Sequence, residues 1–185
     1  MGLRIIGGNF KGRKLCSVSG MITRPTADRL RESIFNILSF RIRGTVVLDL
    51  FAGTGAFGIE ALSRGAEYVV FIDRYQHAIS AIEKNIRSCG INNKAKSIKW
   101  DIIKNLNCIK SPQPLFNLVF MDPPYNKNMI GRTLCNLHLS NCLEKKAFIV
   151  VEHSLSEPIP ENLPEFELVD HRKYGKTLVS FLNYI

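Results

Sequence analysis

From residue 45 onward the sequence alternates between short apolar runs and segments with helical spacing. The apolar runs that predict β-strands cover residues 46–51, 68–73, 96–101, 118–122 and 147–153. Apolar residues recur at helical spacing over 75–89 and 128–139, and another helix is predicted after the glycine-rich turn that follows the first strand. Repeated strand–helix–strand units predict an α/β fold with a mainly parallel sheet.

Two more strand-like segments, ELVDHR at 167–172 and KTLVSFLNYI at 176–185, end the chain. The turn between them is too short for a crossover helix, so they must pair in antiparallel fashion and the sheet is expected to be mixed. In the third strand we expect Ile98 and Trp100 to point into the core, because they alternate with polar residues.

Residues 1–44 are predicted to form a small extension in front of a domain that covers residues 45–185. Two short strands, LRII and RKLCSV, flank the flexible segment GGNFKG, which predicts a hairpin. A helix is then expected to begin at Ala27, with Thr26 as its N-cap. The residues expected to face the core are Leu30, Ile34, Ile37 and Leu38, and those expected to point away are Arg29, Arg31 and Glu32.

Positive charge is concentrated in this extension. Residues 1–44 contain nine Lys and Arg but only two acidic residues, for a net charge of +7, whereas the other 141 residues contribute +2. A basic extension suggests a polyanionic partner. A solubilising arm is an equally good interpretation of the charge alone.

The composition and the N-terminus restrict where the chain can reside. No apolar run approaches the roughly 20 residues of a membrane-spanning helix, and the N-terminus lacks the apolar segment of a signal peptide. We therefore expect a soluble, cytoplasmic protein. The five cysteines form no CxxC pair and the four histidines show no ligand spacing, so neither a disulfide framework nor a metal site is predicted.

The segment DLFAGTG, residues 49–55, lies between the first strand and the following helix. Gly53, Gly55 and Gly58 match the GxGxxG spacing of dinucleotide-binding loops, in which glycines let the backbone approach a ligand closely. Asp49, however, would repel a pyrophosphate and would pair with an ammonium group. S-adenosylmethionine, an amino acid joined to a nucleoside without phosphate, satisfies both features better than NAD, which is the alternative.

Two more acidic residues end the next two strands. Asp73 can accept hydrogen bonds from ribose hydroxyls and Asp101 from the adenine amino group, and the alternative for each is a local helix cap. All three acids are expected to face one crevice, since they end parallel strands. The residues expected to bind the cofactor are Asp49, Phe51, Ala52, Gly53, Thr54, Gly55, Asp73, Arg74, Asp101 and Ile102.

The tetrapeptide Asp122-Pro123-Pro124-Tyr125 follows the fourth strand, and we predict that it is catalytic. The exocyclic amino group of a base is a weak nucleophile, because its lone pair is delocalised into the ring. Asp122 and the Pro123 carbonyl can each accept one N–H and orient that lone pair toward a methyl donor. Pro124 helps to fix the backbone, and Tyr125 can stack on an extruded base. A stiff structural turn is the alternative.

Together these motifs resemble the RsmD-type 16S rRNA (guanine(966)-N(2))-methyltransferase family. The glycine loop and DPPY are shared by many amino methyltransferases, whereas RIIGG and RPTxDR are more discriminating. The resemblance covers nearly the whole chain and includes RIIGGNFKGRKL, TRPTADRLRESIFN, DLFAGTGAFGIEALSRGA, MDPPY and the terminal YGKT.

The resemblance implies a class I S-adenosylmethionine-dependent methyltransferase fold, with a seven-stranded Rossmann-like sheet whose last strand is antiparallel. It implies methyl transfer from S-adenosylmethionine to N2 of a guanine in 16S rRNA, with the small ribosomal subunit as the expected substrate. The enzyme is expected to be monomeric and free of metal. We expect the extension to hold the RNA rather than to shape the core. Its expected RNA contacts are Arg4, Lys11, Arg13, Lys14 and Arg24.

Three other functions are compatible with parts of this pattern. A DNA or RNA adenine amino methyltransferase would share the motifs, although 185 residues leave little room for the target-recognition domain of a DNA enzyme. A non-catalytic RNA-binding assembly factor could keep the fold but would have no use for DPPY. A nicotinamide oxidoreductase is disfavoured by Asp49.

Overall fold

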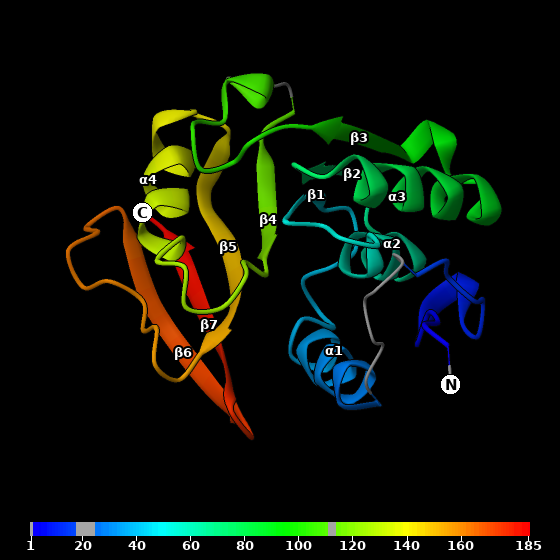
Figure 1. Ribbon diagram of the computed structural model, residues 1–185, viewed down its shortest axis with the longest axis horizontal. Coiled ribbons are helices and arrows are strands. Elements are labelled where there is room, and N and C mark those ends of the chain that lie inside the picture. The colour runs from blue at the N-terminus through cyan, green and yellow to red at the C-terminus, as the bar shows by residue number, and fades with distance from the viewer. Residues whose placement is uncertain (1, 18–24, 111–113) are drawn as a thin grey trace.

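Seven strands form one sheet in the computed structural model, which describes residues 2–17, 25–110 and 114–185 (Figure 1). The strands are β1 (Val46–Leu50), β2 (Tyr68–Asp73), β3 (Ala95–Lys99), β4 (Phe116–Met121), β5 (Leu143–Ser154), β6 (Phe166–Tyr174) and β7 (Thr177–Tyr184). The helices are α1 (Pro25–Ile37), α2 (Ala56–Ser63), α3 (Gln76–Cys89) and α4 (Ile130–Leu139), with short 3₁₀ turns η1 (Gly8–Phe10), η2 (Asn92–Lys94) and η3 (Asn107–Ile109).

The strand order is β3-β2-β1-β4-β5-β7-β6. Strands β1 to β5 pair in parallel, and β7 is antiparallel to both β5 and β6, as the short final turn predicted. The chain leaves β1 toward β2 and β3 and later returns to the other side of β1 as β4. This reversal creates a switch point at the carboxyl ends of β1 and β4, where open α/β sheets bind their ligands.

Successive residues of the central strands β1, β2 and β4 bury against opposite layers of the molecule. Val47 of β1 packs in a cluster with residues of α1, α2 and α3, whereas its neighbour Leu48 packs in a second cluster with residues of α4. This alternation explains the continuous apolar runs, because a sheet covered on both faces needs apolar side chains at every position. No helix in the described part of the chain is long and apolar enough to cross a membrane.

The helix of the extension begins earlier than predicted. It starts at Pro25, a residue whose fixed φ suits the first helical position, so Thr26 lies in the first turn and is not the N-cap. Leu30, Ile34 and Leu38 are buried as predicted.

Two predicted orientations on this helix are wrong. Ile37 is 39% exposed, and Arg31 is buried with 4% exposure. The N-terminal segment lies over the helix at Arg31, whose guanidinium donates to the carbonyl oxygen of Arg4 at 2.6 Å. A long-range contact of this kind overrides the helical pattern.

The predicted inward position of Trp100 is also wrong. Trp100 follows the end of β3, is 37% exposed, and donates its indole N–H to the carbonyl oxygen of Asn105 at 3.0 Å. Ile98, within β3, packs partly buried against the second cluster as expected.

The N-terminal segment folds back on itself, but not as two regular strands. Arg4 and Lys14 form an isolated antiparallel bridge, and the turn between them contains η1. Leu3, Ile5 and Leu15 are buried in the same cluster as residues of α2 and α3. The expectation that the extension does not shape the core is therefore wrong.

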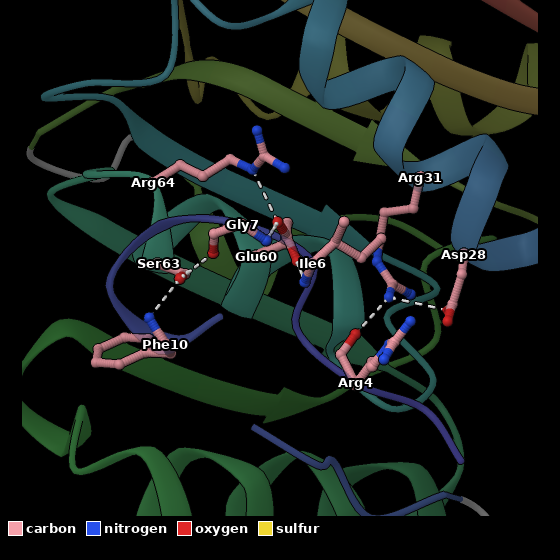
Figure 2. A network of polar contacts seen from close by, with 9 residues as sticks. All are labelled: Arg4, Ile6, Gly7, Phe10, Asp28, Arg31, Glu60, Ser63 and Arg64. Carbon is pink, nitrogen blue, oxygen red and sulfur yellow. Dashed lines mark hydrogen bonds and ion pairs between the residues drawn. The ribbon is translucent and has the colours of Figure 1, made fainter. Parts of the chain in front are cut away.

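Helix α2 holds this segment through two buried side chains (Figure 2). The Glu60 carboxylate accepts hydrogen bonds from the backbone N–H groups of Ile6 and Gly7 at 2.7 and 2.8 Å and from Arg64 at 2.8 Å. The Ser63 hydroxyl donates to the carbonyl oxygen of Gly7 and accepts from the N–H of Phe10. These contacts join the basic segment to the domain as one unit.

We expect Glu60→Ala to destabilise the fold, because it leaves two backbone donors and the Arg64 guanidinium without an acceptor in a buried place. The free energy of unfolding should fall by about 3 kcal/mol, the scale of breaking a buried ion pair, as measured by urea denaturation. Glu67→Ala, at an exposed position before β2, is the matched control and should leave stability nearly unchanged. Equal stability of the two variants would show that Glu60 does not anchor the segment.

Candidate active site

The carboxyl ends of the parallel strands open into one cavity of about 590 Å³, a size typical of small-molecule sites. Thirteen of the fourteen predicted cofactor and catalytic residues line it, and Gly55 does not. The predicted residues in the lining are Asp49, Phe51, Ala52, Gly53, Thr54, Asp73, Arg74, Asp101, Ile102, Asp122, Pro123, Pro124 and Tyr125.

The glycine loop forms one wall of the cavity. Gly53 and Gly55 have φ values of +56° and +76°, in the left-handed region that favours glycine. A side chain at Gly58 would collide with the ring of Phe71, with a Cβ only 2.4 Å from it. Gly58 thus lets α2 approach the sheet, while Gly53 brings its backbone to the cavity.

The backbone fixes the orientation of Asp73, the last residue of β2, and of Asp101, which follows β3. The two carboxylate oxygens of Asp73 accept hydrogen bonds from the N–H groups of Gly53 and Tyr75, both at 2.9 Å. Asp101 accepts from the N–H of Ile103 at 3.1 Å. The helix-cap alternative is wrong for both acids, because the N-cap of α3 is Tyr75, without a side-chain capping hydrogen bond, and a turn follows Asp101. Each carboxylate binds the backbone of a local turn and keeps lone pairs available to the cavity that it lines.

Asp49 occupies a buried position in β1, where it accepts a hydrogen bond from the N–H of Gly58 at 2.9 Å. Burial raises the pKa of its carboxyl to about 8, with a smaller contribution from the nearby Asp73, and the Gly58 hydrogen bond opposes the shift. A carboxyl group in this state gains most from a cationic ligand, because the cation stabilises its ionised form.

The Asp122–Tyr125 turn, which also lines the cavity, meets a carboxyl group that the sequence did not single out. Glu152 of β5 lines the cavity with Asp122, and its Oε1 accepts a hydrogen bond from the Tyr125 hydroxyl at 2.8 Å. The same hydroxyl lies 3.1 Å from Oγ1 of Thr177. Glu152 ends a predicted strand just as the four aspartates do, which is the signal that could have revealed it.

Asp122 and Glu152 share an environment that opposes two negative charges. Asp122 opens to the cavity, but the protein around it removes enough water to raise the pKa of its carboxyl well above the usual value, with added repulsion from Glu152 and Asp49. Burial also raises the pKa of Glu152, while the hydrogen bond from Tyr125 opposes that shift.

A second glutamate missed by sequence reasoning holds the loop that follows the Asp122–Tyr125 turn. The buried Glu157 accepts hydrogen bonds from the backbone N–H groups of Asn126 at 2.6 Å and Met129 at 3.3 Å. Asn126 has a φ of +57°, and its side-chain oxygen accepts from the Ser156 hydroxyl. The Pro- and Glu-rich segment after β5 thus positions the end of the turn, and no local pattern marked it for this role.

Arg31 of α1, which was expected to point away, also lines the cavity. Its side chain reaches toward the N-terminal segment and pairs with Asp28 of the same helix at 3.2 Å (Figure 2). Burial lowers the pKa of its guanidinium. Among the described residues, its Nε has no hydrogen-bond partner.

Of the basic residues expected to bind RNA, the four that the structure describes do not line this cavity. Arg4, Lys11 and Lys14 are exposed. Arg13 is exposed too, but its guanidinium donates to the carbonyl oxygen of Ser88 at 2.6 Å and lies over the ring of Phe10. Arg24 lies outside the described residues.

Comparison with known proteins identifies the family. Residues 3–183 match the family described as "Conserved hypothetical protein 95". The chain belongs to this family. It is 36% identical over 178 residues to "Putative rRNA methyltransferase YlbH" of Bacillus subtilis, which covers 96% of this chain and 97% of that protein. It is 37% identical over 166 residues to "Ribosomal RNA small subunit methyltransferase D" of Haemophilus influenzae, with 86% and 84% of the two chains covered.

The family resemblance predicted from the motifs is thus confirmed, and so is the predicted fold. "Putative methyltransferase yhhF from Escherichia coli" superposes with a TM-score of 0.88 at 29% identity, covering 100% of this chain and 98% of that one. The sheet order and the antiparallel β7 are those of class I S-adenosylmethionine-dependent methyltransferases.

S-adenosylmethionine is the cofactor of this family, and the residues of the cavity fit it. Asp49 is a buried acid whose raised pKa favours a cationic partner, and the ammonium group of the cofactor would be such a partner. Asp73 and Asp101 supply acceptors on neighbouring strands, and apolar side chains such as Ile102 suit an adenine ring. Basic groups that would cradle a pyrophosphate are few, since Arg31 and Arg74 are the basic residues of the described lining.

If Asp49 holds a cation, binding of S-adenosylmethionine must release its proton below pH 8. We expect the affinity to rise as the pH increases from 6 to about 8 and then to level off, because ionisation no longer costs free energy above the pKa. Asp49→Asn should bind at least about tenfold more weakly and lose this slope, as measured by calorimetry in buffers of different ionisation enthalpy.

Asp101→Asn, which removes another carboxylate of the cavity, is the matched control. Its affinity for S-adenosylmethionine should still rise with pH as in the wild type.

Without ligand, the folded protein keeps a proton on Asp49 that the unfolded chain loses above about pH 4. The free energy of unfolding therefore decreases as the pH rises toward 8. Asp49→Asn should therefore unfold at a higher temperature than wild type at pH 8. If the affinity of Asp49→Asn for S-adenosylmethionine rose with pH as steeply as that of the wild type, Asp49 would be excluded as the partner of the cation.

Proposed function

We propose that this protein transfers a methyl group from S-adenosylmethionine to the exocyclic N2 of a guanine in 16S rRNA, with the small ribosomal subunit as substrate. The observation that carries the proposal is the cavity that joins the glycine loop and three strand-end aspartates to the Asp122–Tyr125 turn. The names of relatives support ribosomal RNA of the small subunit as the substrate.

The binding half of the site consists of the ends of β1, β2 and β3. We assign the ammonium group of the cofactor to Asp49, its ribose hydroxyls to Asp73 and its adenine amino group to Asp101. Each of these ligand groups donates hydrogen bonds, and each of these side chains accepts them when ionised. The backbone contacts of Gly53 and Ile103 hold two of the carboxylates in place before the ligand arrives.

The catalytic half consists of the turn after β4. When bound, the cofactor supplies a methyl group on a positively charged sulfur that a nucleophile can attack in line. Asp122 accepts one N–H of the guanine amino group, and the carbonyl of Pro123 accepts the other. Both contacts draw the lone pair of the nitrogen out of conjugation, and Asp122 or water takes the proton that the methylated nitrogen releases.

Tyr125 and the extension provide for the RNA. The Tyr125 hydroxyl is held by Glu152 and Thr177, which fixes the ring at the mouth of the catalytic turn, where it can stack on an extruded base. Lys11 and Lys14 lie in a segment that α2 holds firmly, so their charges keep a defined position for phosphate contacts. Arg4 and Arg13 belong to the same segment, and Arg24 completes the proposed set.

Asp122→Ala should lower single-turnover methyl transfer by about 10² or more, the scale of losing one preorganised polar group. Asp122→Asn should be milder, because its amide oxygen still accepts one hydrogen bond. The measurement follows tritiated methyl transfer to small subunits that lack the modification, with naked 16S RNA and DNA as competing substrates.

Calorimetric affinity for S-adenosylmethionine, the control, should change little in both variants. If Asp122→Ala transferred methyl groups at nearly the wild-type rate, the turn would have only a structural role. The proposed mechanism, in which Asp122 accepts from the guanine amino group, would then be wrong. Transfer to DNA in preference to the subunit would support an amino methyltransferase of another substrate, and binding without transfer would support an assembly factor.

The double variant Lys11→Ala with Lys14→Ala should weaken RNA binding and flatten its salt dependence. Each phosphate contact contributes roughly 0.7 to 0.9 to the slope of log affinity against log salt, so the slope should decrease by about 1.5. Lys110→Ala with Lys145→Ala, which removes two exposed lysines elsewhere, controls for net charge. If both double variants changed RNA affinity and its salt dependence equally, the extension would contribute only to the net charge of the protein and would not form a specific RNA contact.

A further inference from the structure

We propose that Glu152 identifies the target base as guanine by accepting the hydrogen on its N1, while Asp122 accepts from the adjacent 2-amino group. This inference rests on the proposed function and names the residue that sets its base specificity. The Watson–Crick edge of guanine presents two neighbouring donors, N1–H and N2–H. The corresponding edge of adenine presents one donor beside an acceptor, so two adjacent carboxylates match guanine alone.

The register of the sheet places the two carboxyl groups side by side. Phe120 pairs with Val150, and Met121 with Val151, in the parallel ladder of β4 and β5. Asp122 and Glu152 are the residues that directly follow the last pair of this ladder, and they lie close enough to repel each other as carboxylates. Side chains at paired positions of neighbouring strands point to the same face, and both of these line the cavity.

Hydrogen bonding gives the two oxygens of Glu152 different surroundings. Oε1 accepts the hydrogen of the Tyr125 hydroxyl at 2.8 Å, and Tyr125 is held in turn by Thr177. In the described part of the chain, Oε2 receives no hydrogen bond, and the side chain lines the cavity. One oxygen is thus fixed by the protein, and the other is left as an acceptor for a ligand.

The electrostatics of the pair favour a ligand with two donors. Burial and mutual repulsion raise the pKa of Asp122, and burial raises that of Glu152. Two N–H groups on one rigid base supply each carboxylate with a hydrogen bond and so stabilise both ionised groups at once. An acceptor nitrogen facing either carboxylate would add repulsion in a site that already lacks water.

Glu152→Gln reverses the polarity of the contact without removing the one to Tyr125. The amide oxygen can take the position of Oε1 and accept from the Tyr125 hydroxyl, which directs the amide NH₂ into the position of Oε2. The carboxylate oxygen that would accept from N1–H of guanine is thereby replaced by an N–H donor. In this variant the amide NH₂ would face the N1–H of guanine, so the hydrogen bond to guanine is lost. A base whose N1 is an acceptor could instead accept a hydrogen bond from the amide.

2-Aminopurine is the base that tests this reversal, because it keeps the 2-amino group but carries an unprotonated N1. The guanine methylated by the wild-type enzyme is first mapped, and small subunits are then reconstituted with guanine or 2-aminopurine at that position. Wild type should transfer to guanine about 10²-fold faster or more. In Glu152→Gln the guanine rate should fall and the 2-aminopurine rate rise, so that the ratio drops at least about tenfold.

Thr177→Val is the matched control, because it removes the other partner of the Tyr125 hydroxyl and leaves the carboxylate in place. It should change both rates alike and keep their ratio. Glu152→Gln would also keep the ratio if Glu152 only held Tyr125 in place. Glu152→Asp, which retains a carboxylate, should keep the preference for guanine. Wild-type affinity for S-adenosylmethionine verifies that each variant is folded.

An unchanged ratio of the two rates in Glu152→Gln, with an active wild type, would overturn the role of Glu152 and leave the proposed function standing. Absence of transfer by wild type to any guanine of the subunit would overturn the proposed function and this inference together.

Discussion

Parallel pairing of β1 to β5 brings five carboxyl groups to one edge of the sheet, and the chemistry of the site depends on this constraint. Burial raises the pKa values of Asp49, Asp122 and Glu152, and repulsion from neighbouring carboxylates adds to the shift at Asp49 and Asp122. Backbone N–H groups of the intervening turns orient the other two. Such a concentration of acids is costly to bury, and it makes the cavity selective for ligands that donate. The five residues are Asp49, Asp73, Asp101, Asp122 and Glu152.

The same electrostatic rule applies to both ligands that we propose for the cavity. An ammonium group, ribose hydroxyls, an adenine amino group and the N–H groups of guanine are all donors, and each one offsets a buried carboxylate. Phosphates, which are acceptors, are disfavoured in the cavity. Phosphate contacts of an RNA substrate therefore fall to the exposed basic residues of the N-terminal segment.

That segment is attached to the helix that begins at the glycine loop. Glu60 and Ser63 of α2 bind its backbone, Asn85 of α3 binds Cys16 and the carbonyl oxygen of Thr54, and Arg31 joins α1 to it at the cavity wall. A basic surface held in this way has a fixed position relative to the site. RNA bound at the segment would thus be presented to the cavity in one orientation.

By itself, the sequence determined the order of the strands and helices, the mixed sheet, the glycine loop and the acids that follow it, because these depend on periodicity and on turns of a few residues. Only the tertiary structure decided the places of Arg31, Glu152 and Glu157 and the burial of the N-terminal segment. Glu152 acquires its neighbour through the register of β4 against β5, and Glu60 binds a backbone 54 positions earlier in the chain. Local patterns carry no record of such contacts, since they form only when distant segments pack.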